Sequence, residues 1–179
     1  MNQSYWDRAK AFHGHACPGL AIGVKVWEAA AEKLGADPSF DEELACVVEN
    51  DACGVDAIQA LAGCTFGKGN LIHKDTGKHA YTFISRKTGR ALRFYFKALR
   101  ADMDREAFQQ YLLDAPAEDL FECREIAMDI PCCARKFTSV KCELCGESAA
   151  ENKIRLQEGK KVCLDCFKHY SRVLPGSSR

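Results

Sequence analysis

The clearest hydrophobic pattern in the chain lies between residues 18 and 34. Apolar side chains recur there at steps of three and four residues, which predicts a helix with one buried stripe: Leu20, Val24, Trp27, Ala31 and Leu34. Pro18 stands where a helix can begin without losing a hydrogen bond, and Gly35 stands where it can end. Shorter patterns predict further helices at about 4–12, 54–62 and 104–113, and a short helix from Pro116 to about Cys123.

Strand patterns alternate with these helices. The unbroken apolar run at 44–49 predicts a buried strand, and alternating residues at 79–85 and 91–97 predict two more after a short one at 71–74. Turn residues separate the last three strands, which indicates a meander, and a further strand is expected at 126–130. The order helix–strand–helix–strand–strand–strand predicts the α+β class.

Charge is distributed unevenly between two predicted domains. The 179 residues carry 25 basic and 25 acidic side chains, but from Pro131 onward there are 10 basic and 5 acidic ones. We therefore expect an acidic domain over residues 1–130 and a small basic domain over 131–179. A basic domain can bind an acidic protein or nucleic acid, although no row of basic and aromatic residues favours nucleic acid.

Two cysteine pairs dominate the basic domain. Cys142 and Cys145 form one C-x₂-C pair, Cys163 and Cys166 form another, and 17 residues separate the pairs. This spacing is typical of a four-cysteine zinc site, and the polar segment between the pairs alternates like a hairpin, so the sequence predicts a zinc ribbon. Two disulfides or four unrelated thiols are the alternatives. So small a segment has almost no core without a metal or another cross-link.

The compartment follows from the cysteines and the N-terminus. The 11 cysteines are odd in number, and the first residues lack a basic region followed by an apolar run. No stretch approaches the roughly 18 apolar residues of a membrane helix. We therefore expect a cytoplasmic protein with reduced thiols.

A second group of potential ligands surrounds the first two long helices. His13, His15 and Cys17 lie in a loop before one helix, Cys53 opens the next helix and Cys64 closes it. Imidazole and thiolate ligands suit Zn²⁺ and other divalent transition metals better than Mg²⁺, so one histidine could bind a metal while the other acts as a base. Ordinary packing of these side chains is the alternative.

Other motifs leave more alternatives open. The Gly67-Lys68-Gly69-Asn70 loop could hold an anion with its backbone N–H groups and one cation, or it could be a tight turn. Cys46 lies in an apolar strand and is expected in the core. Cys132 and Cys133 could form a redox pair, although ordinary packing is favoured, and the role of Cys123 stays open.

Three blocks carry a resemblance to a known family. They are residues 13–23 (His-Gly-His-Ala-Cys-Pro-Gly-Leu-Ala-Ile-Gly), 53–59 (Cys-Gly-Val-Asp-Ala-Ile-Gln) and 63–71 (Gly-Cys-Thr-Phe-Gly-Lys-Gly-Asn-Leu). In order and spacing they resemble the FmdE family, which is named for the E component of formylmethanofuran dehydrogenase. The resemblance covers roughly residues 5–130, and many members also carry a C-terminal zinc ribbon.

The resemblance implies a fold, a partner and a site. It implies an α-β-α-β(3) core with a mixed sheet, similar to the C-terminal domain of glyceraldehyde-3-phosphate dehydrogenase, and a homodimer. It associates the protein with the molybdenum or tungsten enzyme that makes formylmethanofuran. The family's polar cluster falls on six residues of this chain: His13, His15, Cys17, Cys53, Asp56 and Cys64.

We expect an accessory or metal-site subunit of such an enzyme, with structural zinc in the ribbon and a second divalent ion, Zn²⁺ or another metal, in the N-terminal domain. His15, Cys17 and Cys53 are the leading ligands, and His13 or Cys64 would complete the set. An open metal position would face Lys68 and Asp56. His13, Cys17 and Lys68 are the candidate catalytic residues, and the candidate cofactor-binding residues are Asp56, Gly67, Lys68 and Gly69.

Two other functions fit the same residues. The protein could be a metal- or ligand-sensing module whose basic ribbon binds protein or nucleic acid. It could also be a stand-alone enzyme with Cys17 as nucleophile and His13 or His15 as base.

Overall fold

The computed structural model describes residues 2–97, 103–128, 133–170 and 172. The chain divides into two compact units, Met1–Ala134 and Arg135–Arg179, which are described separately below. The boundary expected between residues 130 and 131 stays a prediction, because 129–132 lie outside the described residues. None of the described helices is both long enough and apolar enough to cross a membrane.

The longest helix of the first unit begins and ends at the residues that the sequence singles out. Cys17 is the N-cap of the longest helix, where its Sγ accepts a hydrogen bond from Leu20 N over 3.3 Å, and Gly35 ends that helix in the left-handed conformation. The predicted bounds of α2 and α3 are confirmed. Within the described residues, the α-helices of this unit are α1 (Gln3–His13), α2 (Pro18–Leu34), α3 (Gly54–Ala62), α4 (Arg105–Asp114) and α5 (Ala117–Leu120).

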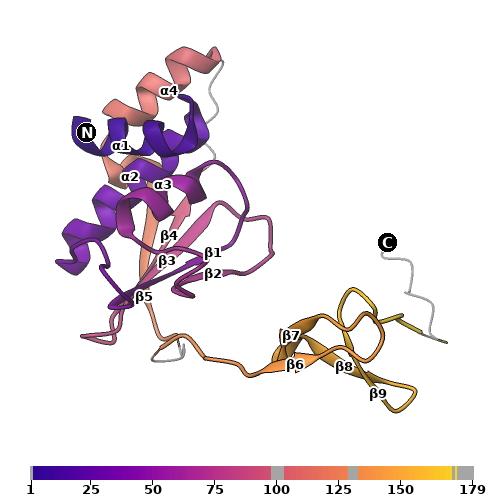
Figure 1. The fold of residues 1–179 in the computed structure, drawn as a ribbon. Helices are drawn as coiled ribbons and strands as arrows, with labels where there is room; N and C mark the ends of the chain where they lie inside the picture. The colour runs from indigo at the N-terminus through magenta and orange to yellow at the C-terminus, as the bar shows by residue number, and fades with distance from the viewer. Residues whose placement is uncertain (1, 98–102, 129–132, 171, 173–179) are drawn as a thin grey trace. The chain divides into compact units, whose positions relative to one another are not determined.

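A mixed five-stranded sheet supports these helices, in the order β2-β1-β3-β4-β5 (Figure 1). Only the β1–β2 pair is parallel. This confirms the α+β class and the α-β-α-β(3) order, whereas the likeness to glyceraldehyde-3-phosphate dehydrogenase stays a prediction. The strands are β1 (Leu44–Val48), β2 (Leu71–His73), β3 (Ala80–Ser85), β4 (Ala91–Phe96) and β5 (Phe121–Ile126).

The last strand differs from its prediction. It begins at Phe121, whereas the sequence indicated a helix to about Cys123 and a strand only from Ile126. The reason is tertiary, because the Phe121 ring packs 6.3 Å from that of Phe94 and β5 pairs with β4 along its whole length. Residues 129 and 130 of the predicted strand lie outside the described residues.

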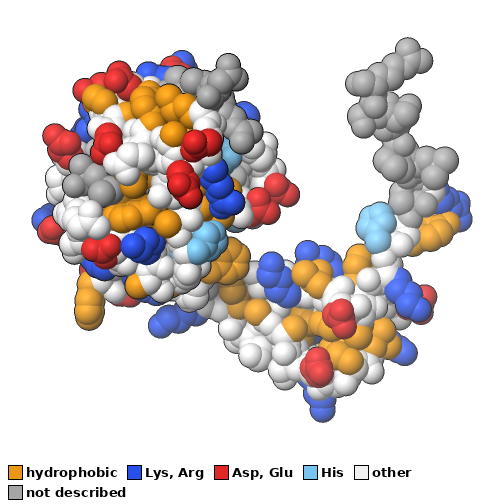
Figure 2. Space-filling model, turned by 90° about the horizontal axis from the view of Figure 1, so that it is seen from above, with side chains coloured by type: hydrophobic (Ala, Val, Ile, Leu, Met, Phe, Trp, Pro, Cys, Tyr) orange, Lys and Arg blue, Asp and Glu red, His pale blue; other side chains and the backbone are white. Residues whose placement is uncertain are grey.

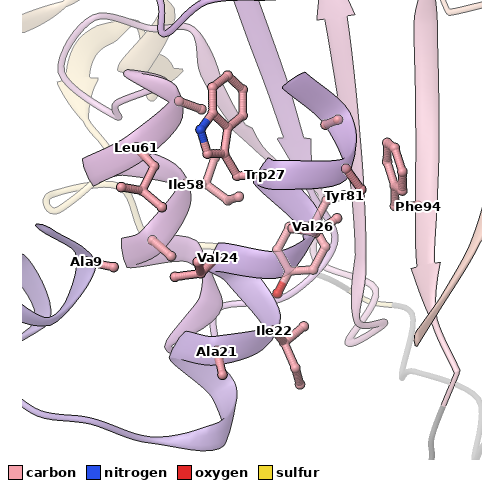
Figure 3. Packing of buried hydrophobic residues seen from close by; sticks show 14 of the residues in the cluster. Ala9, Ala21, Ile22, Val24, Val26, Trp27, Ile58, Leu61, Tyr81 and Phe94 are labelled. Atoms are coloured by element: carbon pink, nitrogen blue, oxygen red, sulfur yellow. The ribbon is translucent and has the colours of Figure 1, made fainter. Parts of the chain in front are cut away.

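The core lies between one face of the sheet and the helices (Figure 3). Trp27 of α2 and Phe83 and Phe94 of the sheet are almost fully buried there. Helices α2 and α3 approach so closely that an ideal Cβ placed on Gly23 would lie 2.3 Å from the carbonyl oxygen of Gly54. The Cys17 and Cys53 ends of these two helices are therefore held by backbone packing.

Two small hairpins form the second unit, as the sequence predicted for a ribbon. Strands β6 (Ser139–Lys141) and β7 (Ser148–Ala150) form the first, and β8 (Ile154–Gln157) and β9 (Lys160–Cys163) form the second, with the 3₁₀ helix η1 (Glu151–Lys153) between them. Cys142 and Val162 are its buried hydrophobic residues among those described. So little apolar burial leaves the unit dependent on another source of stability.

Candidate metal centres

Four cysteines meet at one point of the ribbon. The ligand atoms of Cys142, Cys145, Cys163 and Cys166 all lie within 4.8 Å of one another. Thiolates bound about 2.3 Å from a tetrahedral zinc are about 3.8 Å apart, and the Sγ atoms of Cys145 and Cys163 are 3.9 Å apart. The donor set and its geometry therefore fit a structural zinc ion.

Electrostatics at this cluster also fit a cation. Backbone N–H groups, first that of Cys145 and then that of Cys163, lower the pKa of Cys142 to about 6. Hydrogen bonds with the thiols of Cys163 and Cys145 raise the pKa of Cys166 to about 12. Cys142 therefore ionises readily, whereas Cys166 resists ionising beside it unless a positive ion lies between them.

A second cluster lies where three helices of the first unit meet. His13 is the last residue of α1, Cys17 caps the start of α2, and Cys53 caps the start of α3. Their ligand atoms lie within 4.8 Å of one another, and Cys17 Sγ is 3.8 Å from His13 Nε2. A tetrahedral zinc would place such a sulfur and nitrogen about 3.6 Å apart, so the cluster needs little adjustment to bind one.

Asp56 fixes the orientation of the histidine. His13 Nδ1 donates a hydrogen bond to Asp56 Oδ2 over 2.7 Å, which leaves Nε2 free to face the thiols. Gln59 Nε2 in turn donates to Asp56 Oδ1 over 3.4 Å. A carboxylate that holds a ligating histidine by its second nitrogen is a common arrangement around protein-bound metals.

The thiol of Cys53 has an environment that a metal would change. Burial, and then a hydrogen bond with Cys17, raise the pKa of Cys53 above its ordinary value. A helix N-terminus alone would have the opposite effect on this pKa, because it favours thiolate. The neighbouring thiol and desolvation outweigh the helix in the metal-free chain, and a bound cation would favour the ionised form.

The structure separates the other predicted ligands from this cluster. His15 is exposed, and its ring stacks on His13 with centroids 4.4 Å apart, but it does not join the three ligand atoms. Cys64 lies at the far end of α3, where its Sγ donates to Leu44 O and burial raises its pKa to about 12. Helix α1 extends one residue beyond its predicted end, and it is His13 that it brings to the cysteines.

Lys68 is also directed elsewhere. Its Nζ donates to the carbonyl oxygens of Ser39 and Phe40, at 3.1 and 3.4 Å. Among the described residues, neither Gly67 nor Gly69 lines the pocket beside His13. Anion binding by this loop and catalytic roles for His13, Cys17 and Lys68 stay predictions.

A pocket of about 340 Å³ opens beside His13 and Cys53. Asp56 lies in its wall, as predicted for the open side of the site, but no Lys or Arg is among the described residues that line it. It is lined by His13, Val48, Asn50, Asp51, Ala52, Cys53, Val55, Asp56, Phe66, Leu71 and His73. The sequence offered His73 as a residue that could line the site, and it does so. Sequence reasoning missed Asp51 and Phe66, although Phe66 is an aromatic residue inside a glycine-rich loop.

Asn70 has a structural role that the sequence did not reveal. Its side chain is fully buried; Oδ1 accepts from Thr65 N over 2.9 Å, and Nδ2 donates to Leu44 O over 2.9 Å. Loop 63–70, which carries Phe66, is thereby fastened to strand β1.

The remaining cysteines that the structure describes take no part in either cluster. Burial raises the pKa of Cys46 well above its ordinary value, which agrees with a core position. Cys123 and Cys133 are exposed, whereas Cys132 lies outside the described residues, so a redox pair at 132–133 stays a prediction.

Known proteins share both units of this chain. Residues 12–129 match the family described as FmdE, molybdenum formylmethanofuran dehydrogenase operon, and residues 132–172 match the prokaryotic dksA/traR C4-type zinc finger. The fold is similar to the crystal structure of a tungsten formylmethanofuran dehydrogenase FmdE-like protein from Syntrophus aciditrophicus. That structure has a TM-score of 0.67 and 22% identity, with 92% of this chain and 90% of that chain covered.

A curated relative is longer. The protein named "Probable S-adenosyl-L-methionine-binding protein" of Archaeoglobus fulgidus is 31% identical over 200 residues, which cover 93% of this chain and 53% of the relative. The chain thus spans about half the length of that protein. Because the family match extends over well more than half of its residues, the protein belongs to the FmdE family, as a metal-binding member with a four-cysteine zinc site in its C-terminal ribbon.

Proposed function

We propose that the protein is an accessory or metal-site subunit associated with molybdenum or tungsten formylmethanofuran dehydrogenase-type redox chemistry. In this proposal His13, Cys17 and Cys53 hold one divalent transition metal, and the ribbon cysteines hold a structural zinc. The link to formylmethanofuran dehydrogenase rests on the name of the family and on the related crystal structure.

The observation that carries the proposal is a three-ligand cluster at the wall of a pocket. Structural zinc sites are normally closed by four protein ligands, whereas sites that act on a bound molecule keep one position open. His13 and Cys53 both line the pocket, and Asp56 accepts a hydrogen bond from His13 Nδ1, the ring nitrogen that does not face the thiols. Such a metal would polarise a ligand atom bound at its open position.

Metal counting tests the proposed site. The zinc-loaded wild-type chain should contain two ions, and His13→Ala should contain one, because the ribbon zinc remains. His15→Ala is the matched control, since His15 is a neighbouring histidine outside the cluster, and it should keep two ions. Two ions in His13→Ala and in the Cys17→Ser, Cys53→Ser double variant would refute the proposed centre.

The sensor alternative is not favoured by the ribbon surface. Figure 2 shows Lys and Arg side chains scattered among apolar and acidic ones on the visible face of the ribbon unit, not gathered in one stripe. Nucleic-acid binding through phosphates relies on clustered cations. Salt-dependent retention of the protein on immobilised DNA would revive this alternative.

A homodimer is proposed on the family resemblance. Exposed aromatic surface adds little support, because Phe83, Phe94 and Phe96 are buried on the helix-covered face of the sheet and Tyr95 alone among these four residues is exposed. Sedimentation of the full chain at micromolar concentration should give twice the mass of 19.9 kDa. A monomer alone would contradict the proposal.

The name of the Archaeoglobus relative supplies a candidate ligand. If this chain shares that property, S-adenosyl-L-methionine would occupy the pocket beside the N-terminal metal. Equilibrium dialysis of the zinc-loaded chain with the labelled compound tests this, and no retention at millimolar concentration would exclude it.

A further inference from the structure

Apart from the imidazoles of His13 and His73, the ionisable side chains that line the N-terminal pocket in the described part of the chain are two carboxylates and the thiol of Cys53. Asp51 and Asp56 contribute carboxylates, and no Lys or Arg in the described part of the chain lines it. Lys68, the nearest expected cation, donates to Ser39 and Phe40 carbonyls instead. Two thiolates would neutralise a divalent ion at the proposed centre, so the carboxylates would determine the charge that a ligand meets.

The two carboxylates differ in what they already bind. Asp56 accepts hydrogen bonds from His13 and Gln59. Asp51 is exposed, and its side chain forms no hydrogen bond or ion pair with any residue that the structure describes. Asp51 is therefore the carboxylate that remains available to pair with a bound molecule.

An aromatic ring lies at the same pocket. Phe66 lines the pocket and is 71% exposed, so its ring is accessible to a bound molecule. Its loop is held by Asn70, whose buried side chain bonds both Thr65 and strand β1. An aromatic face beside a carboxylate is a favourable environment for a cation.

The other walls indicate an organic ligand. Val48, Val55 and Leu71 supply apolar surface, and the volume of about 340 Å³ is at the lower end of the range for small-molecule pockets. A bare inorganic cation would leave this surface without a partner. Phosphates and other anions would meet two carboxylates and, among the described lining residues, no Lys or Arg.

We propose that this pocket selects small organic cations, such as ammonium or sulfonium compounds, through the Asp51 carboxylate and the exposed Phe66 ring. This inference rests on the proposed function, because it assigns the ligand class of the same pocket. Neither residue belongs to the metal-ligand set, so the ligand class and the metal can be tested separately.

Two pairs of probes isolate the effect of charge. S-adenosylmethionine and S-adenosylhomocysteine differ in one methyl group and its positive charge, and choline and 3,3-dimethylbutan-1-ol are a charged and a neutral compound of the same shape. Calorimetry on the zinc-loaded full chain should show a preference of at least about tenfold for the cation in one pair or both. Equal affinity within both pairs, or no binding of either cation at concentrations on the order of 10 mM, would overturn the inference.

Substitutions at Asp51 and Phe66 test whether these residues cause the preference for a cation. Asp51→Asn should remove most of it, on the order of tenfold, and Phe66→Ala should weaken cation binding on the order of threefold to tenfold. Asp75→Asn and Phe40→Ala are matched controls, since both residues are exposed and neither lines the pocket, and they should change nothing. An undiminished preference in Asp51→Asn would overturn the assignment.

Measuring the metal content shows whether the ligand class or the proposed metal centre is wrong. Two ions per chain without a cation preference would refute only the ligand class. One ion per chain, with a cation preference that depends on Asp51, would refute the metal centre and uphold the ligand class.

Discussion

Replacing Gly23 by alanine should damage the fold and the metal centre together. The added Cβ would lie 2.3 Å from Gly54 O, 2.7 Å from Gly54 Cα and 2.7 Å from Ala57 Cβ. Two of these three atoms belong to the backbone of α3, so no change of side-chain rotamer can relieve the contact. The two helices must separate by about 1 Å to restore normal contact distances.

The size of the effect follows from two opposing contributions. Alanine in place of glycine inside a helix stabilises it by about 1 kcal/mol. Overpacking a tight interface costs about 1–3 kcal/mol, and a contact against backbone belongs at the upper end of that range. We expect a net loss of about 2 kcal/mol in the free energy of unfolding, or a fall in Tm of about 6–10 °C for a unit of this size.

The same movement should weaken the N-terminal metal centre. Cys17 and Cys53 stand at the starts of the two helices, and a metal tolerates deviations of only about 0.2 Å in its ligand distances. Gly67→Ala is the matched control, because a Cβ there meets nothing within 4 Å and Gly67 does not have a positive φ. Calorimetric scanning and metal counting check both effects; a Gly23→Ala chain that matches Gly67→Ala in Tm and keeps two ions would refute the reasoning.

Three further outcomes are expected. Cys163→Ser should expose the ribbon to protease and leave the first unit resistant, since zinc binding contributes on the order of 10 kcal/mol to such folds, and an intact ribbon in metal-free buffer would contradict this. Asn70→Ala should lower the free energy of unfolding in urea by about 3 kcal/mol, because Thr65 N–H and Leu44 C=O lose their buried partner, and a loss below about 1 kcal/mol would be inconsistent with that role. Arg93 Nε donates a hydrogen bond to Glu49 over 2.7 Å and lowers the pKa of Glu49 in the folded state. The stability that this pair contributes is therefore complete above the pKa of Glu49 in the unfolded chain, and it is lost as the pH falls through the lower pKa of the folded state. The stability difference between wild type and Arg93→Met should therefore shrink from pH 7 to pH 3, and a constant difference would show that the pair does not act through this proton.

Local sequence patterns were sufficient to predict which helices and strands form, but not where each of them begins and ends. The period of apolar residues predicted α2 and α3 with the correct bounds, because caps and breakers stand at their ends. Strand β5 was assigned wrongly at its start, since Phe121 follows a helical pattern and only its packing against Phe94 and Phe96 favours an extended backbone. Propensity is a weak guide where tertiary packing opposes it.

The ribbon cysteines and the proposed N-terminal ligands also differ in how far the sequence predicted them. Cys142, Cys145, Cys163 and Cys166 come in two close pairs, so spacing alone predicted that they would meet. In the first unit, the choice between His13 and His15 depends on where α1 ends and how Gly14 turns the chain. Spacing carries no such information, and it also could not show that Lys68 would bond Ser39 and Phe40.

Glycines in the sequence blocks that resemble the FmdE family determine where Cys17 and Cys53 lie. A Cβ on Gly19 would lie 3.2 Å from Cys53 Cβ, and one on Gly54 would lie 2.4 Å from the hydroxyl of Tyr81, which supports α3 from the sheet (Figure 3). A Cβ on Gly54 would also lie 3.0 Å from the backbone oxygen of Gly19, so a side chain there would have to displace the start of α2. The distance between Cys17 and Cys53 is therefore set by contact between backbones, which have no alternative rotamers. A site built in this way is organised before the metal arrives, so binding should cost little reorganisation and should discriminate sharply among metals of different size.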